Sequence, residues 1–254
     1  MIYTSNMIDE INQKFTPDKD TKIARYMGFD KFKLLVENKN LWFANKKKFM
    51  DKNEGAIPES FFNNWNEDTA KNYSTIQKLK SCIYTAYISC WFEYKRESEP
   101  MWLAYGGMKK NEIRDSNGIC IITDVDKLSV CTSCLDAQIY KISYIDYKEN
   151  EKVEPPFYFS KNTKTGSTFN GRVFYAYKQK EYSSENEIRA ITYKFLQKEG
   201  ISANINPMKF ISNIIINPHA SKEQTDLMVN YLERHNLIDK LIESKIMCKL
   251  SKEK

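Results

Sequence analysis

Two glutamates, Glu185 and Glu187, are the residues of this chain whose type and spacing most directly suggest chemistry. They lie where a polar loop gives way to an apolar run that starts at Ile188. In an extended segment, residues i and i+2 point to one face, so both acids would look into one cleft while Ile188 turns into a core. Adjacent carboxylates suit a cation, a ligand or a reaction. The structural alternative is a solvated strand edge, with Arg189 pairing one of the acids.

Other polar and aromatic residues lie on or beside predicted strands. Arg25 ends the first of these strands next to Tyr26, and Ser89 lies within a later, apolar strand. Trp102 and Tyr105 are three residues apart on a short predicted helix, so they share one side of it. Each has a structural alternative: a surface ion pair for Arg25, a backbone hydrogen bond for Ser89, and core packing for the aromatic pair.

A third group of acids raises the question of a metal. Asp51 and Glu54 follow the second predicted strand, and together with Glu185 and Glu187 they would supply the carboxylates that hard cations prefer. A nuclease with such a centre is therefore one alternative. It requires the four acids to converge within a few ångströms.

Zinc is a weaker interpretation of the sequence. Cys131 and Cys134 have the spacing of metal ligands, but no second such pair exists, and the only histidines are His219 and His235. We predict reduced thiols and no bound metal.

Composition limits the class of protein. The 254 residues are 41% hydrophobic and 13% aromatic, enough for a sizeable core, and the net charge is +6. No secretion signal opens the chain and no run of eighteen apolar residues occurs, so we expect a cytoplasmic protein without a membrane partner. The Lys-rich run at residues 46–48, followed by Phe49, resembles a nucleic-acid-binding stripe only faintly. A surface loop is its alternative.

The phosphate-binding patterns G-x-x-x-x-G-K and G-x-G-x-x-G are absent from the sequence. This excludes phosphate-loop NTPases and dinucleotide-binding Rossmann domains.

The elements that must position these residues indicate an α+β fold. We predict a single domain over residues 1–254, with an N-terminal extension at 1–20, a polar helical insertion at 59–80, and a C-terminal helix and tail at 221–254. Strands are predicted over residues 22–26, 41–44, 82–91, 118–123, 137–145, 187–193 and 210–216. Asp30 is predicted to cap a helix that ends at Glu37. Pro100 is predicted to begin a short helix that ends at Tyr105. Ser221 is predicted to cap the last helix, with Gln224 completing a capping box. A mixed, largely antiparallel central sheet with flanking helices accommodates this order.

Several of these segments together resemble a known family. The order is Arg25-Tyr26, Leu41-Trp42-Phe43-Ala44, Phe49-x-Asp51-x-x-Glu54, Ile88-Ser89-Cys90, Met101-Trp102-x-x-Tyr105, Gly118-Ile119-Cys120-Ile121 and Tyr182-x-x-Glu185-x-Glu187-x-Arg189. It resembles the bacterial "domain of unknown function 2971" family from about Ile23 to Leu250. Departures from the family pattern are Met50, Lys52, Leu103 and Tyr182.

The layout is also similar to ADP-ribosyltransferases of the arginine–serine–glutamate type, and this similarity implies a fold and an activity. NAD would be the substrate, and Glu187 would stabilise the positive charge that develops on its ribose. Arg25 would bind the pyrophosphate, with Tyr26 beside it, and Ser89 would orient the ribose or Glu187. Trp102 or Tyr105 would stack on nicotinamide, and Glu185 would orient or deprotonate the acceptor.

The resemblance further implies a toxin or antiphage defence component. Its acceptor would be a protein or a nucleic acid, and a neutralising or sensor protein would be a further partner. The main alternative is a non-enzymatic module that binds a protein or a nucleotide and uses the same acids as contacts.

Overall fold

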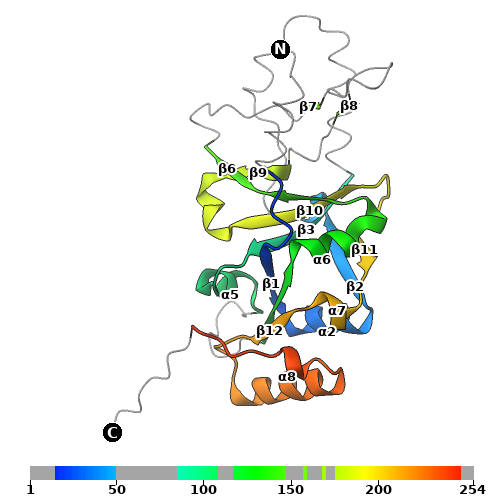
Figure 1. The fold of residues 1–254 in the computed structure, drawn as a ribbon. Coiled ribbons are helices and arrows are strands. Elements are labelled where there is room, and N and C mark those ends of the chain that lie inside the picture. The colour runs from blue at the N-terminus through cyan, green and yellow to red at the C-terminus, as the bar shows by residue number, and fades with distance from the viewer. Residues whose placement is uncertain are drawn as a thin grey trace, which may run out of the picture. The chain divides into compact units, whose positions relative to one another are not determined.

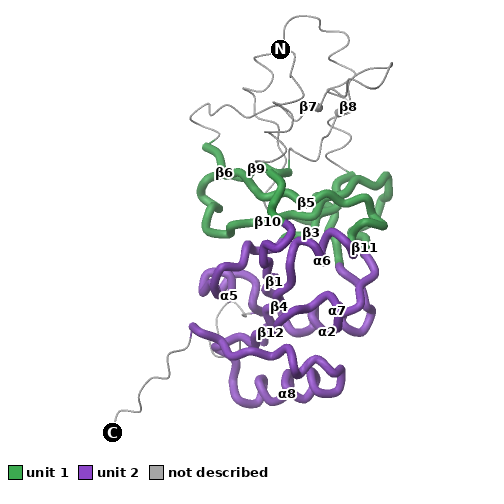
Figure 2. Tube along the Cα trace, in the orientation of Figure 1, with its two compact units in different colours: residues 1–18, 42–90, 132–202 green, residues 19–41, 91–131, 203–254 purple. Residues whose placement is uncertain are grey.

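The computed structural model describes residues 15–49, 85–107, 117–146, 157–158, 168–169 and 175–246. These residues form an α+β fold with a largely antiparallel sheet and several helices, as the sequence predicts (Figure 1). The chain divides into two compact units (Figure 2). Unit 1 draws its described residues from 1–18, 42–90 and 132–202, and unit 2 from 19–41, 91–131 and 203–254. The single domain with its subdivisions, and the ADP-ribosyltransferase-like arrangement, stay predictions.

Unit 2 is centred on three antiparallel strands, β1 (Lys22–Gly28), β4 (Gly118–Asp124) and β12 (Asn213–Ile216). β4 pairs with β1 along its whole length and with β12 along part of it. Every residue of β4 is buried, so both faces of this strand are covered. At one end of the β1–β4 ladder, Gly28 lies opposite Gly118.

The helices of unit 2 are α2 (Phe29–Glu37), α5 (Glu99–Tyr105), α6 (Val125–Thr132), α7 (Pro207–Phe210) and α8 (Lys222–Arg234). α2 buries Phe32, Leu35 and Val36, whose spacing places them on one side of a helix. α8 packs on α2 through the Tyr231 ring, which meets the rings of Phe29 and Phe32 edge to face. A 3₁₀ turn, η5 (Ile238–Lys240), follows α8.

The predicted helix caps have different outcomes. Ser221 accepts a hydrogen bond from the Gln224 backbone, and the Gln224 side chain accepts one from the Ser221 backbone, so the capping box is confirmed. The cap assigned to Asp30 is wrong. Gly28 occupies the N-cap position of α2, and Asp30 lies in the first turn, where its charge suits the helix dipole.

Unit 1 contains strands that pair around β3 (Ala86–Glu93) and β10 (Glu187–Tyr193). β3 pairs with β2 (Asn40–Asn45) and with β10, and β10 pairs in turn with β5 (Gln138–Lys141). The last residues of β3 belong to unit 2, where Phe92 and Glu93 pair with β1.

The remaining elements of the chain are short. β6 (Ser143–Ile145) and β9 (Tyr177–Gln179) form a parallel pair, and β7 (Phe157–Tyr158) pairs with β8 (Thr168–Phe169). β11 (Gly200–Asn204) pairs with β2. Three 3₁₀ turns complete the set, at η1 (Lys46–Lys48), η2 (Ser133–Leu135) and η4 (Lys180–Glu185).

The alternation of strand side chains separates two faces in unit 1. Ala86, Ile88 and Cys90 of β3 contribute to one apolar cluster, to which β10 contributes Ile191 and Tyr193. Because neighbouring strand residues point to opposite faces, Glu187 and Arg189 share the face of Ile191.

Several predicted boundaries are wrong. The strand predicted over 137–145 is interrupted at Ile142, and the one over 210–216 begins only at Asn213, after α7. α6 and β11 were not predicted. The helical insertion predicted over residues 59–80 lies outside the described residues, as do residues 1–14 of the predicted N-terminal extension. Within the described part of the chain, no helix is both long and apolar enough to cross a membrane.

Candidate functional site

The candidate site lies where β9, η4 and β10 follow one another in unit 1. Glu185 is the last residue of η4, and Glu187 is the first residue of β10. Between them, Asn186 adopts a left-handed conformation with φ 37° and ψ 55°. The extended segment that the sequence predicted is therefore wrong. Asparagine is among the few residues that tolerate this conformation, so it suits the change from 3₁₀ turn to strand.

The two acids nevertheless reach the same ammonium group. Lys178 Nζ lies 2.5 Å from Glu185 Oε2 and 3.3 Å from Glu187 Oε2. The ring of Tyr182 lies 4.8 Å from the same nitrogen, at cation–π distance. Lys178 is buried, which is unusual for lysine and requires the paired carboxylates. The pairing therefore gathers Glu185 and Glu187 into one site.

Arg189 holds the other side of the Glu187 carboxylate. Its Nε donates to Oε1 at 2.9 Å and its Nη2 to Oε2 at 2.7 Å, a bidentate contact. Arg189 Nη1 also donates to the Tyr175 carbonyl at 3.1 Å. The Arg189 side chain is 0% exposed, so the pair is shielded from water.

Charge around Glu187 determines its ionisation. Burial alone raises the pKa of this carboxyl, but Arg189, Lys178 and a hydrogen bond from the Cys90 thiol outweigh burial and lower the pKa to about 2. Glu187 is therefore a fixed, ionised carboxylate at neutral pH. Glu185 has a side chain that is 20% exposed and is the more accessible of the two acids.

Two neighbouring groups complete the surroundings of Glu187. Its backbone N–H donates to the Tyr144 hydroxyl at 2.8 Å, and burial raises the pKa of that hydroxyl. Cys90 of β3 hydrogen-bonds the carboxylate. Ser89 is fully buried and, by strand alternation, points to the opposite face of β3 from Cys90. The structure thus brings Cys90 to Glu187, and the predicted role of Ser89 stays a prediction.

The predicted NAD-binding residues belong to unit 2. The Arg25 guanidinium lies 5.7 Å from the centre of the Trp91 ring. Tyr26 and Trp102 are buried and contact each other edge to face, with ring centres 4.8 Å apart. Tyr105 is 47% exposed, which leaves it the accessible ring of α5. Tyr26 and Trp102 are core residues, whereas stacking by Tyr105 stays a prediction.

Lys178, Tyr144 and Cys90 were missed at the sequence level. The signal for Lys178 was a lysine directly after the aromatic run Tyr175-Ala176-Tyr177, in a segment that is equally compatible with helix or strand. A charge inside an otherwise buried run requires a partner, and Glu185 and Glu187 follow within nine residues.

The described residues contain no group of three or more His, Cys, Asp or Glu side chains arranged to hold a metal ion. Cys131 and Cys134 are not joined to each other or to another described cysteine by a disulfide bond. Asp51 and Glu54, which the nuclease alternative requires, lie outside the described residues.

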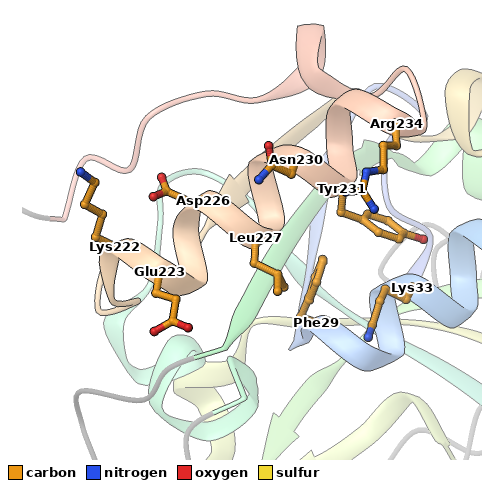
Figure 3. A pocket seen from close by; sticks show the side chains of 9 residues that line it. All are labelled: Phe29, Lys33, Lys222, Glu223, Asp226, Leu227, Asn230, Tyr231 and Arg234. Carbon is orange, nitrogen blue, oxygen red and sulfur yellow. The ribbon is translucent and has the colours of Figure 1, made fainter.

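Each unit has a groove on its described surface. In unit 2, a groove of about 780 Å³ lies between α8 and the start of α2 (Figure 3). Phe29 and Lys33 reach it from α2, and Leu227, Tyr231 and Arg234 from α8. The unit 1 groove, of about 550 Å³, involves η1 and the loop between β10 and β11. Neither groove is lined by Glu185 or Glu187.

Comparison with known proteins finds a match between part of the chain and one family model. A family model described as "Protein of unknown function (DUF2971)" matches residues 101–190. The matched stretch includes Trp102, Tyr105, Glu185 and Glu187, and it supports the resemblance to this family over those residues. The description assigns no activity. No curated protein matches the chain.

Proposed function

We propose that this protein transfers ADP-ribose from NAD to an acceptor and uses the Glu185–Glu187 pair for the reaction. The observation that supports the proposal is the convergence of both acids on Lys178 Nζ, at 2.5 and 3.3 Å. One acid is buried and held ionised, whereas the other is partly exposed. Two carboxylates in different environments suit two different roles.

The proposed reaction breaks the bond between ribose C1′ and the nicotinamide nitrogen. Nicotinamide leaves with the bonding electron pair, and positive charge develops on the ribose. Glu187, fixed by Arg189, stabilises that charge electrostatically. A nitrogen or oxygen of the acceptor then bonds to C1′, and its proton passes to the Glu185 carboxylate.

The experiment is incubation of the full chain with NAD labelled on the adenylate portion and with cell lysate. Nicotinamide release and label transfer are both measured. Wild type is expected to show both, and Glu187→Gln to lose both. Glu185→Gln is expected to lose transfer by about 100-fold or more, the usual effect of removing a general base. Label transfer by Arg25→Lys tests the prediction that Arg25 binds the pyrophosphate.

Glu181→Gln is the matched control, because Glu181 is an exposed acid on the same turn, η4. Its activity is expected to equal that of wild type. Thermal melting separates loss of fold from loss of chemistry in Glu187→Gln. Wild-type protein that neither releases nicotinamide nor transfers label would overturn the proposal.

A second candidate is a non-enzymatic module that binds a protein or a nucleotide. The burial of Glu187 in a bidentate pair with Arg189 favours it, since such pairs also occur as purely structural contacts. The placement of Ser89 on the other face of β3 favours it too. This candidate predicts that Glu187→Gln protein that still folds keeps the cellular phenotype, whereas an enzyme loses it. The toxin or defence setting, and a neutralising or sensor partner, come from the family resemblance.

A further inference from the structure

An exposed phenylalanine marks the loop between β10 and β11. Phe195 is 83% exposed, the highest exposure among the large hydrophobic residues of the described chain. Leu196 beside it is 44% exposed. A single exposed apolar residue is common, but an aromatic ring held at the rim of a groove suggests a partner for its face.

Hydrogen bonds hold the loop that carries Phe195 at the residues directly before and after it. The Lys194 N–H donates to the Thr85 carbonyl at 3.1 Å. The Tyr87 hydroxyl donates to the Leu196 carbonyl at 2.5 Å. The backbone on either side of Phe195 is therefore fixed, and a ligand that stacks on the ring need not first order this loop.

Lysines surround the groove beside Phe195. Lys47 and Lys48 reach it from η1, and Lys198 from the same loop as Phe195. Among the described residues that line the groove, Glu199 is the one acid, and it pairs with Lys48. The described lining therefore carries net positive charge. η1 and the loop between β10 and β11 are far apart in the sequence. The run at residues 46–48 was therefore seen without its partners on that loop, and it gave only a faint signal of nucleic-acid binding.

We propose that this surface, defined by Lys47, Lys48, Lys198 and Phe195, binds single-stranded nucleic acid. A base stacks on the Phe195 ring, and the lysines contact neighbouring phosphates. In a duplex the bases already stack on one another and offer no free face, so a single strand fits better. Binding of this kind needs no NAD. That the bound strand is the acceptor of ADP-ribose rests on the proposed function.

The experiment measures fluorescence anisotropy of labelled twelve-nucleotide oligo-dT and oligo-U with the full chain, without NAD and at several salt concentrations. Phe195→Ala is expected to weaken binding by about 5- to 150-fold, the measured range for one base–aromatic stack. Lys47→Gln with Lys198→Gln is expected to lower the slope of log affinity against log salt by about 1.4. Preference for oligo-U assigns RNA, and preference for oligo-dT assigns DNA.

Leu227→Ala and Lys222→Gln are the matched controls, since both residues are exposed on α8 of unit 2. They are expected to bind as wild type does. Equal affinity of wild type and Phe195→Ala, an unchanged salt slope, equal binding of a twelve-base-pair duplex, or no binding to either strand would each overturn the proposal. Strand binding without nicotinamide release would overturn the transferase alone.

Discussion

The Arg189 guanidinium donates two hydrogen bonds, of 2.9 and 2.7 Å, to the carboxylate of Glu187, two residues earlier on the same face of β10. Ile188 between them points to the opposite face and is fully buried. A short strand thus places an ion pair on one side and an apolar contact on the other. The contact with Arg189 also keeps Glu187 ionised, so the packing of this strand and the charge of its acid involve the same two residues.

Breaking this pair is expected to destabilise the fold. Glu187→Gln leaves the Arg189 charge buried without its carboxylate, and we expect a loss of about 3 kcal/mol in the free energy of unfolding. Urea denaturation measures it. The double variant Glu187→Leu/Arg189→Met removes both charges and is expected to recover most of the loss. Glu187→Leu and Arg189→Met made singly complete the cycle, and additive effects of these two changes would contradict the pairing.

Acid is expected to weaken the protein through Glu187. Its pKa is lowered to about 2 in the folded state, against an ordinary value near 4.5. The stabilisation is therefore complete above about pH 4.5 and is lost as pH falls toward 2. Urea denaturation between pH 7 and pH 3 should show this fall in wild type and in Glu181→Gln. A Glu187→Gln variant should show a flatter profile, and an equally steep one would argue against this origin.

Gly118 is expected to tolerate no side chain. A Cβ atom there would lie 1.9 Å from the Gly106 carbonyl oxygen, so backbone would have to move. We expect Gly118→Ala to lose about 3 kcal/mol, which lowers Tm by roughly 6–12 °C. Its strand partner Gly28 is the control, since a Cβ there meets its nearest neighbour at 3.7 Å. Similar melting of the two variants would contradict the close approach of Gly118 to Gly106.

The capping box of α8 gives a smaller, local effect. Ser221→Ala removes the acceptor for the Gln224 backbone N–H and is expected to cost about 1 kcal/mol. Ser221→Asp keeps an acceptor at the N-cap and adds a charge that suits the helix dipole, so it should match wild type. Chemical denaturation of the three proteins distinguishes these outcomes. Equal loss in both variants would mean that the hydroxyl acts in another way.

Local patterns in the sequence were sufficient for much of the fold. β1, β4 and α8 follow from apolar runs and a capping box, which depend on neighbouring residues only. The cap of α2 was misassigned because Asp30 is a good capping residue in isolation, whereas the turn out of β1 places Gly28 there. The short strand β11 pairs with the distant β2, so no local signal reveals it.

The site was predictable only in part for the same reason. The acids Glu185 and Glu187 stand out through their own spacing, and Arg189 was visible as a partner. Lys178 reaches them through the turn η4, whose tertiary path the sequence does not specify. Trp102 was predicted to stack on a ligand, but its side chain is buried in the core of unit 2, where its ring meets that of Tyr26 edge to face.

The left-handed conformation of Asn186 has a consequence for how this pair of acids can change. The relative placement of Glu185 and Glu187 depends on the backbone conformation of Asn186 between them, as well as on the shared contact with Lys178. A β-branched residue at position 186 would disfavour that conformation and separate the acids, although both would still be present in the sequence. Two chains with an identical Glu-x-Glu pattern can therefore differ in whether the pattern forms a site, and the intervening residue distinguishes them.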